Sequence, residues 1–139
     1  MLIRKQCPLC GKVTYLNVSH EMKCEYEDYI CYGGMIQDKL KSFDKFGREF
    51  CKTGYCPSCQ EKLFSSKLKD KSGYFYLDEL RLDVMEKFME NTEEFNCEEA
   101  IISEYANILS REEKLVFLHD FDMEVEYELN SDNKVVLKE

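Results

Sequence analysis

Residues 7–10 read CPLC and residues 56–59 read CPSC, and these two matching stretches determine the fold that we expect. A C-x-x-C turn points both sulfur atoms inward and aims backbone N–H groups at them, which stabilises the thiolates that bind metal. Two such turns facing each other form a closed tetrahedral site. The sequence therefore predicts one structural zinc ion bound by Cys7, Cys10, Cys56 and Cys59.

Two alternatives for these four thiols stay open at the level of sequence. Iron is a second possible occupant, because the stretch CPLCG resembles the knuckle of rubredoxin and a soft four-thiolate site accepts either metal. Four free buried thiols are the other alternative. Where the metal is bound, four sulfur ligands leave no position for water or substrate, so we expect the ion to be structural and not catalytic.

The composition favours a soluble intracellular protein. The chain has 139 residues and eight cysteines. It has no apolar run near the roughly 20 residues of a membrane span. The N-terminus lacks an apolar stretch followed by a small-residue cleavage site, so we expect no secretory signal. In a reducing cytoplasm, paired cysteines bind metal in preference to forming disulfides.

The charge is divided unevenly along the chain. Residues 1–69 hold twelve Lys and Arg against eight Asp and Glu, a net charge of +4, whereas residues 70–139 hold seven against twenty, a net charge of −13. The polar stretch 67–73, which ends in a glycine, separates the halves. We therefore expect a zinc-ribbon-like lobe at 1–69 and an acidic helical lobe at 70–139.

Periodicity and capping signals predict an α+β fold, in which a small four-cysteine zinc-ribbon lobe with short helices precedes a helical acidic lobe that ends in a β-hairpin. In the first lobe we expect a strand at 12–19, helices at 25–32 and 35–43, and a turn of helix from the N-cap Asp44 to Gly54, with Leu63 and Phe64 packed back onto the lobe. In the second lobe we expect helices at 77–90, from Asn96 and from Ser110, and strands at 123–129 and 135–138 around the turn 130–133.

The order of motifs in the first lobe is similar to that of a known group. The CPLCG knuckle is followed by Gly33-Gly34 leading to Ile36-Gln37, by Arg48-Glu49, and by Gly54-Tyr55 before the second knuckle. Over residues 7–64 this resembles small zinc-ribbon proteins of phage and mobile-element genomes. The chain departs from them at Gln60, where they carry Trp, and residues 70–139 have no counterpart. The resemblance implies a zinc ribbon in a bacterial host cell and implies no activity.

The remaining reactive residues have simpler interpretations. We expect Cys24, Cys31 and Cys51 to be small buried hydrophobes, with a second metal site that includes His20 as the alternative. His119 fits a surface position at a helix C-terminus. The pair Arg48-Glu49 is expected to be an internal bracket to the second knuckle, with recognition of a phosphate or carboxylate as the alternative. We find no catalytic motif and expect no enzyme, although strand carboxylates leave an enzymatic role as a third alternative.

Two functions fit these features. The first is a protein–protein interaction module, most specifically an inhibitor of a host defence system such as a CRISPR nuclease, whose carboxylates occupy a site built for phosphates on a host or phage protein. Ordinary solubilising charge is the plain alternative. The candidate contact residues are Glu93, Glu94, Glu98, Glu99, Glu112, Glu113, Asp120, Asp122, Glu124, Glu126 and Glu128.

The second function is a nucleic-acid-binding zinc ribbon. The basic lobe would contact the phosphate backbone and stack bases on interleaved aromatic side chains. The candidate contacts are Lys39, Lys41, Lys45, Arg48 and Lys52.

Overall fold

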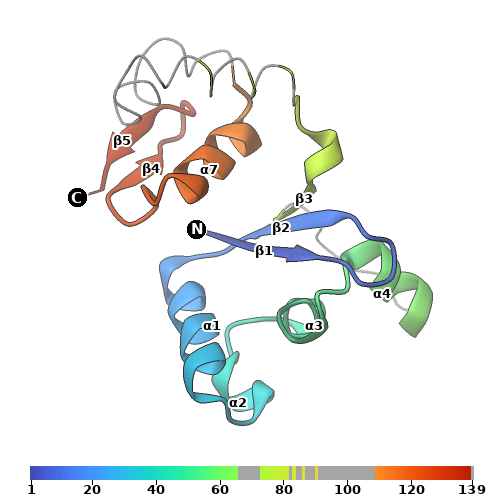
Figure 1. Cartoon of the computed structure of the whole chain (residues 1–139). Coiled ribbons are helices and arrows are strands. Elements are labelled where there is room, and N and C mark those ends of the chain that lie inside the picture. Colours follow the sequence, from blue (N-terminus) through green and yellow to red (C-terminus); the bar gives the residue numbers. More distant parts are fainter. Residues whose placement is uncertain (66–72, 82, 84–85, 87–89, 91–108, 139) are drawn as a thin grey trace. The chain divides into compact units, whose positions relative to one another are not determined.

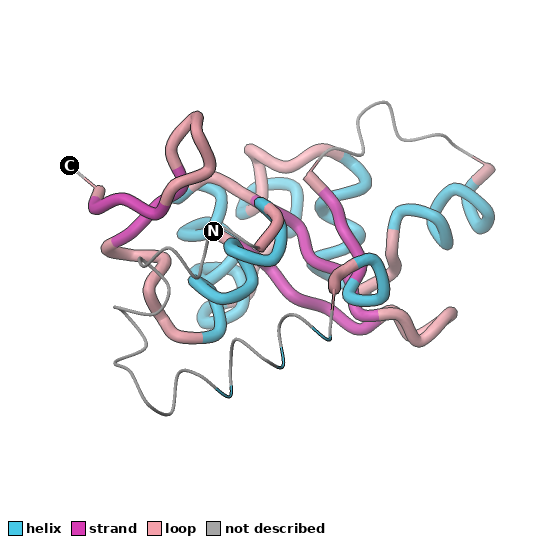
Figure 2. Tube along the Cα trace, turned by 90° about the horizontal axis from the view of Figure 1, so that it is seen from above, coloured by secondary structure: helices cyan, strands magenta, loops and turns pink. Residues whose placement is uncertain are grey.

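The protein combines helices with two antiparallel sheets, which confirms the predicted α+β class (Figures 1 and 2). The computed structural model describes residues 1–65, 73–81, 83, 86, 90 and 109–138. It contains two compact units, Met1–Leu77 and Asp78–Glu139. The boundary that we expected after residue 69 falls within 66–72, outside the described residues.

A three-stranded sheet organises the N-terminal unit. Strand β1 (Leu2–Gln6) pairs with β2 (Val13–Asn17), and β2 pairs with β3 (Tyr74–Tyr76), all antiparallel. Only β2 was expected from the sequence. The short strands β1 and β3 carry little signal of their own, because a strand is stabilised by its neighbours in the sheet. Pairing with β2 places β3 within the first compact unit.

Three helices, α1 (His20–Tyr32), α2 (Ile36–Lys39) and α3 (Lys45–Thr53), lie on one side of this sheet (Figure 1). Helix α1 (His20–Tyr32) begins earlier than expected, because the Ser19 hydroxyl accepts a hydrogen bond from the Met22 N–H and caps the helix. Helix α2 (Ile36–Lys39) is a single turn and not the predicted helix over 35–43. The chain has to leave the helical conformation before Asp44, whose backbone is extended.

Helix α3 (Lys45–Thr53) confirms the predicted caps. The Asp44 carboxylate accepts a hydrogen bond of 2.7 Å from the Gly47 N–H, and Gly54 ends the helix with a left-handed φ of 82°. The buried face of α3 joins α1, the sheet and the segment after α2 in one core. That core consists of Ile3, Leu16, Val18, Tyr26, Leu40, Phe43, Phe50 and Cys51.

Helix α4 (Pro57–Phe64) follows at once from the second knuckle and was not expected. Proline at the first helical position is favourable, because its missing N–H would have no partner inside the helix. The prediction that Leu63 and Phe64 pack back is wrong, since their side chains are 52% and 46% exposed. They lie in the last turn of α4, where one face of the helix is turned to solvent.

The C-terminal unit is described in part. A 3-10 turn, η1 (Leu77–Glu79), stands where we expected the start of a helix, and Asp83, Glu86 and Glu90 are helical. The rest of that helix, and the helix expected from Asn96, lie outside the described residues. Helix α7 (Arg111–Asp120) begins with the predicted capping box between Ser110 and Glu113.

The predicted closing hairpin is present as β4 (Tyr127–Leu129) and β5 (Val135–Leu137). Its turn is held by the Asn130 side-chain oxygen, which accepts hydrogen bonds from the N–H groups of Asp132 and Lys134. Strand β4 is shorter than the expected 123–129. Residues 124–126 form a turn in which Val125 is 68% exposed, so the alternation of the sequence does not continue through them.

Candidate metal centre

The first knuckle connects β1 to β2. The Cys7 N–H donates to the Lys12 carbonyl at 2.9 Å, which extends the strand ladder by one step, and the Gly11 N–H donates back to the Cys7 carbonyl at 2.8 Å. Gly11 has a φ of 76°, a conformation that glycine adopts without steric cost. The connection between β1 and β2 is therefore a tight turn that brings the sulfur atoms of Cys7 and Cys10 close together.

The second knuckle is placed against the first by the end of α3. A Cβ atom on Gly54 would lie 3.3 Å from the Gln6 carbonyl oxygen, so a larger residue would push the two knuckles apart. Beyond it, Cys56 is the N-cap of α4. The Cys56 N–H donates to the Cys7 sulfur at 3.5 Å, which joins the two knuckles directly.

The structure shows why a glutamine stands at position 60, directly after the second knuckle. Its side chain is 1% exposed, and its amide donates to the backbone carbonyls of Phe46 and Tyr55 at 3.0 and 2.8 Å. It thereby satisfies two carbonyl groups and fastens α4 to α3 and to the loop before the knuckle. Where the resembling proteins carry Trp, this chain uses a buried amide.

The four predicted ligands are brought together. The sulfur atoms of Cys7, Cys10, Cys56 and Cys59 all lie within 4.8 Å of one another, and those of Cys10 and Cys56 are 3.7 Å apart. Zinc–sulfur bonds of about 2.3 Å in a tetrahedron place neighbouring sulfurs about 3.8 Å apart. The donor set and its spacing fit a single tetrahedral metal ion.

The four thiols differ in burial and acidity. Cys7 and Cys56 are buried, Cys59 is half-buried and Cys10 is exposed as a residue, although its sulfur faces the other three. Burial disfavours the thiolate of Cys7, but backbone N–H groups of Cys56 and Cys10 outweigh it and bring its pKa down to about 6.

Removal from water and the neighbouring thiols have the opposite effect on two of the ligands. They raise the pKa values of Cys10 and Cys59 above that of an ordinary thiol. Several thiolates cannot share this space without a cation, so a bound metal ion would favour ionisation of the whole set.

The other cysteines lie apart from this cluster. Cys51 is buried as predicted, and burial raises the pKa of its thiol to about 12. The prediction of burial is wrong for Cys24 and Cys31, which are exposed on α1. The Cys24 sulfur lies 3.6 Å from the His20 ring. Among the described residues, however, the four-cysteine cluster is the one group of three or more such side chains close enough to hold an ion. Cys97 lies outside the described residues.

The pair Arg48-Glu49 lies near the end of α3. The Thr53 hydroxyl donates to the Glu49 carbonyl at 2.9 Å, lies 3.4 Å from the Glu49 carboxylate and accepts from the Tyr55 N–H. Glu49 therefore takes part in the turn that leads to the second knuckle, as the internal interpretation of the pair predicts. Arg48 is half-buried.

The predicted basic contacts differ in their exposure and in their ion pairing. Lys41, Lys45 and Lys52 are exposed. Lys39 instead forms an ion pair of 3.3 Å with Asp28, so a carboxylate of the same chain partly neutralises its charge.

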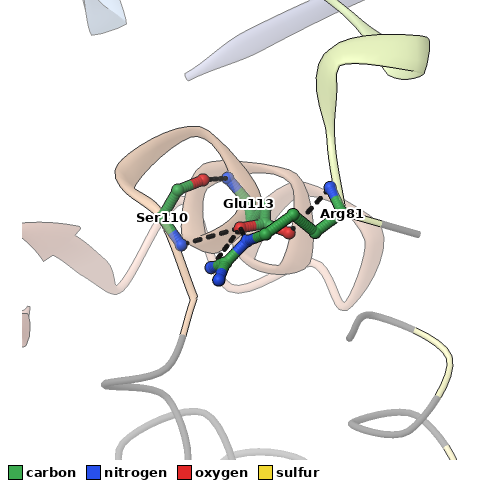
Figure 3. A network of polar contacts seen from close by, with 3 residues as sticks. All are labelled: Arg81, Ser110 and Glu113. Carbon is green, nitrogen blue, oxygen red and sulfur yellow. Dashed lines mark hydrogen bonds and ion pairs between the residues drawn. The ribbon is translucent and has the colours of Figure 1, made fainter. Parts of the chain in front are cut away.

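The prediction that Glu113 is one of the acidic contacts to a partner is wrong, because this residue is buried. Its side chain is 1% exposed, and its carboxylate accepts hydrogen bonds from the Arg81 guanidinium at 2.7 Å and from the Ser110 N–H at 2.8 Å (Figure 3). Burial opposes its ionisation, but the N–H of Ser110 and the charge of Arg81 lower its pKa. A carboxylate held in this way is structural and is not available to a partner.

The other predicted acidic contacts divide into three groups. Glu124 accepts a hydrogen bond of 2.8 Å from the ring of His119, which is therefore not a free surface histidine. Glu93, Glu94, Glu98 and Glu99 lie outside the described residues. The predicted acidic contacts that are exposed in the described part of the chain are Glu112, Asp120, Asp122, Glu126 and Glu128.

Comparison with protein-family models, with curated proteins and with solved structures finds no match for this chain. The similarity to phage zinc ribbons therefore has no support beyond the residues quoted for it. No helix in the described part of the chain is long and apolar enough to cross a membrane.

Proposed function

We propose that this protein binds one structural zinc ion and acts, without catalysis, by contacting another protein. The observation that carries the metal site is the cluster of four sulfur atoms within 4.8 Å, assembled from two turns that are 45 residues apart in the sequence. Four thiolates fill a tetrahedral shell and leave no open position for water or substrate. The role that fits such a site is to join the ends of the N-terminal unit.

Iron is the alternative occupant, because its four-thiolate sites have the same geometry. Zinc has a filled d shell and gives a colourless protein, whereas an iron–thiolate site absorbs visible light. The colour of the purified protein and its metal content therefore distinguish the two metals.

The proposed contact surface is the exposed part of the acidic C-terminal unit. Five of the predicted acidic contacts, in α7 and the segment that follows it, are exposed, and the −13 charge of residues 70–139 gives this half of the chain a strongly negative field. A folded acidic surface can occupy a basic site made for nucleic-acid phosphates. In its most specific form, we propose an inhibitor of a host defence system, such as a nuclease.

The metal is tested by measuring zinc per chain in Cys10→Ser and in Cys24→Ser. Both residues are exposed, but only Cys10 belongs to the cluster. We expect about one zinc per chain in the wild type and in Cys24→Ser, and a large loss of bound zinc in Cys10→Ser. A wild-type protein purified without zinc or iron would refute the site.

The contact surface is tested with a double charge reversal, Glu126→Lys with Glu128→Lys. The control is Glu27→Lys with Asp38→Lys, which reverses two exposed charges in the N-terminal unit. A protein captured from host lysate should bind the first variant at least about tenfold more weakly than the control. Equal binding by the two variants would remove the acidic surface from the proposal.

Binding to nucleic acid is the alternative function. A gel shift at about 50 mM salt, where phosphate contacts are strong, tests it. A shift that is lost in Lys41→Glu with Lys45→Glu would support the alternative, and no shift with DNA or RNA would exclude it.

A further inference from the structure

The N-terminal unit contains a cavity of about 320 Å³ that belongs neither to the cysteine cluster nor to the acidic surface. Its wall is formed by side chains of α1, of β2 and β3, and of the segment that leads into α3. Ligand-binding pockets of proteins begin at about 300 Å³. The space is therefore large enough for a small organic molecule.

The wall of this cavity changes from apolar to polar toward solvent. Leu16 and Phe43 are buried, at 7% and 4% exposure, and form its apolar base. Ser42 and Asp44 are exposed, so polar groups stand where the cavity opens. A ligand that fits this arrangement has an apolar body and a polar head.

Asp44 gives the cavity its charge, because it alone is charged among the described residues that line the wall. Its carboxylate oxygen Oδ1 accepts the hydrogen bond of 2.7 Å from the Gly47 N–H. Within the described part of the chain, the other oxygen of this carboxylate has no hydrogen-bond partner. A carboxylate bound on one side only retains acceptor sites for a further donor.

A second carboxylate adds to the negative charge at the opening. The Glu25 side chain of α1 accepts from the Ser42 N–H at 3.0 Å and from the Ser42 hydroxyl. This hydroxyl therefore has its own hydrogen engaged and adds no free donor for an anionic ligand. Two carboxylates at one opening favour a cation and disfavour an anion.

A glycine in the first turn of α3 permits this arrangement. Gly47 is buried, although glycine is less favourable than alanine inside a helix. A Cβ atom at this position would lie 3.1 Å from the Asp44 carboxylate and 3.1 Å from the Phe43 ring, both of which line the cavity. The absence of a side chain lets the carboxylate and the aromatic ring approach the same turn.

We propose that this cavity binds a small organic cation, whose ammonium group pairs with the Asp44 carboxylate while its apolar body packs against Leu16 and Phe43. Charge-assisted hydrogen bonds between an ammonium group and a carboxylate are among the stronger polar contacts. The aromatic rings of Phe43 and Tyr74 in the wall add surfaces that attract cations. The inference uses neither the metal site nor the acidic C-terminal unit.

Three probes of nearly equal size separate charge from shape. They are phenethylamine, the neutral 2-phenylethanol and the anionic 3-phenylpropanoate. Binding to the intact chain is followed by NMR through the backbone amide of Gly47, which donates to Asp44 and responds to a new partner of that carboxylate. We expect saturable binding of the amine, binding at least about tenfold weaker for the alcohol, which lacks the charge, and no binding of the anion.

A matched pair of variants tests the role of Asp44. Asp44→Asn removes the charge and keeps the helix cap, because asparagine caps helices as well as aspartate does. Asp38→Asn removes an exposed carboxylate of α2 that is not part of the cavity wall. The affinity for phenethylamine should fall at least about tenfold in the first variant and stay at the wild-type value in the second.

The outcomes decide the proposal in either direction. A saturating shift of the Gly47 amide that requires the amine and is lost in Asp44→Asn alone would support it. No saturable binding of the amine, equal affinity for the three probes, or equal affinity of the two variants would overturn it. Thermal unfolding shows whether the variants are folded, and the three probes test the wild type independently of them.

Discussion

Each of the two units of this protein is stabilised internally, and the kind of contact that stabilises it differs between them. In the N-terminal unit, two cysteine turns 45 residues apart meet in one cluster, beside a sheet whose third strand comes from the end of the unit. In the described part of the C-terminal unit, the central contact is an ion pair between the buried Glu113 carboxylate and the half-exposed Arg81, and the hairpin follows α7 closely in the chain.

The comparison shows how a small unit compensates for a small core. The first unit has a four-cysteine cluster that fits a metal ion, and the free energy of binding such an ion would become free energy of folding. The second unit buries a charge and satisfies it fully, because an unsatisfied buried carboxylate would cost more than the contact contributes. The two solutions predict different sensitivities to metal removal, acid and mutation.

Removal of zinc should have the largest effect, and it should be local. Structural zinc contributes on the order of 10 kcal/mol to the folding of small zinc domains. With a chelator, or in Cys59→Ser, we expect hydrogen exchange of β1, β2 and α4 to rise steeply, while α7 and the β4–β5 hairpin keep their protection. Equal loss of protection in both units would contradict the division.

Acid should weaken zinc binding next. The raised pKa values of Cys10 and Cys59 mean that these thiols carry protons without metal at neutral pH, so zinc binding has to release them. The pKa of Cys7 is lowered from its ordinary value near 9 to about 6. The stabilisation of its thiolate is therefore fully present above pH 9 and is lost as the pH falls through 6.

We therefore expect zinc affinity to fall continuously from pH 8 to pH 6. Calorimetry in two buffers with different ionisation enthalpies would count the protons released. Binding without proton release would contradict the assigned protonation states.

In the C-terminal unit, Glu113→Gln should lower the free energy of unfolding by about 1–3 kcal/mol, because Arg81 loses its charged partner. The matched control is Glu112→Gln, an exposed neighbour on the same helix. The folded pKa of Glu113 is lowered, so its contribution is present above the ordinary carboxyl range and is lost as the pH falls below that range. Denaturant unfolding at pH 7 and pH 3 would measure both effects, and the two variants should converge at the lower pH.

The smallest effect concerns a helix cap in the N-terminal unit. Asp44→Ala removes the acceptor for the Gly47 N–H and should cost about 1 kcal/mol. Lys45→Ala is the control at the next position, which is exposed. Thermal unfolding of the zinc-loaded protein should show a lower midpoint for Asp44→Ala alone.

The successes of sequence reasoning were local. The caps Asp44 and Ser110, the stop at Gly54 and the turn after Asn130 each depend on groups within a few residues, so their signals survive in the sequence. The failures were of another kind. Strand β1 carries a mixture of charged and apolar residues, and its pairing with β2 decided its conformation.

Residue type alone also misplaced several side chains. Glu113 looks like one of many surface acids, yet Arg81, 32 residues away in the chain, makes its burial possible. Cys24 and Cys31 look like buried thiols, yet α1 carries them on its exposed side. Such outcomes depend on which distant groups meet, and a single sequence does not record that.

The sequence by itself determined the four clustered cysteines, the α+β class, the helix caps and the closing hairpin, because spacing and local hydrogen bonds specify them. Only the tertiary structure decided that β3 joins the first sheet, that Glu113 is internal and that the Tyr76 hydroxyl lies beside that of Ser58. The physical reason is that each of these depends on a partner far along the chain, whose position is set by the packing of the whole unit.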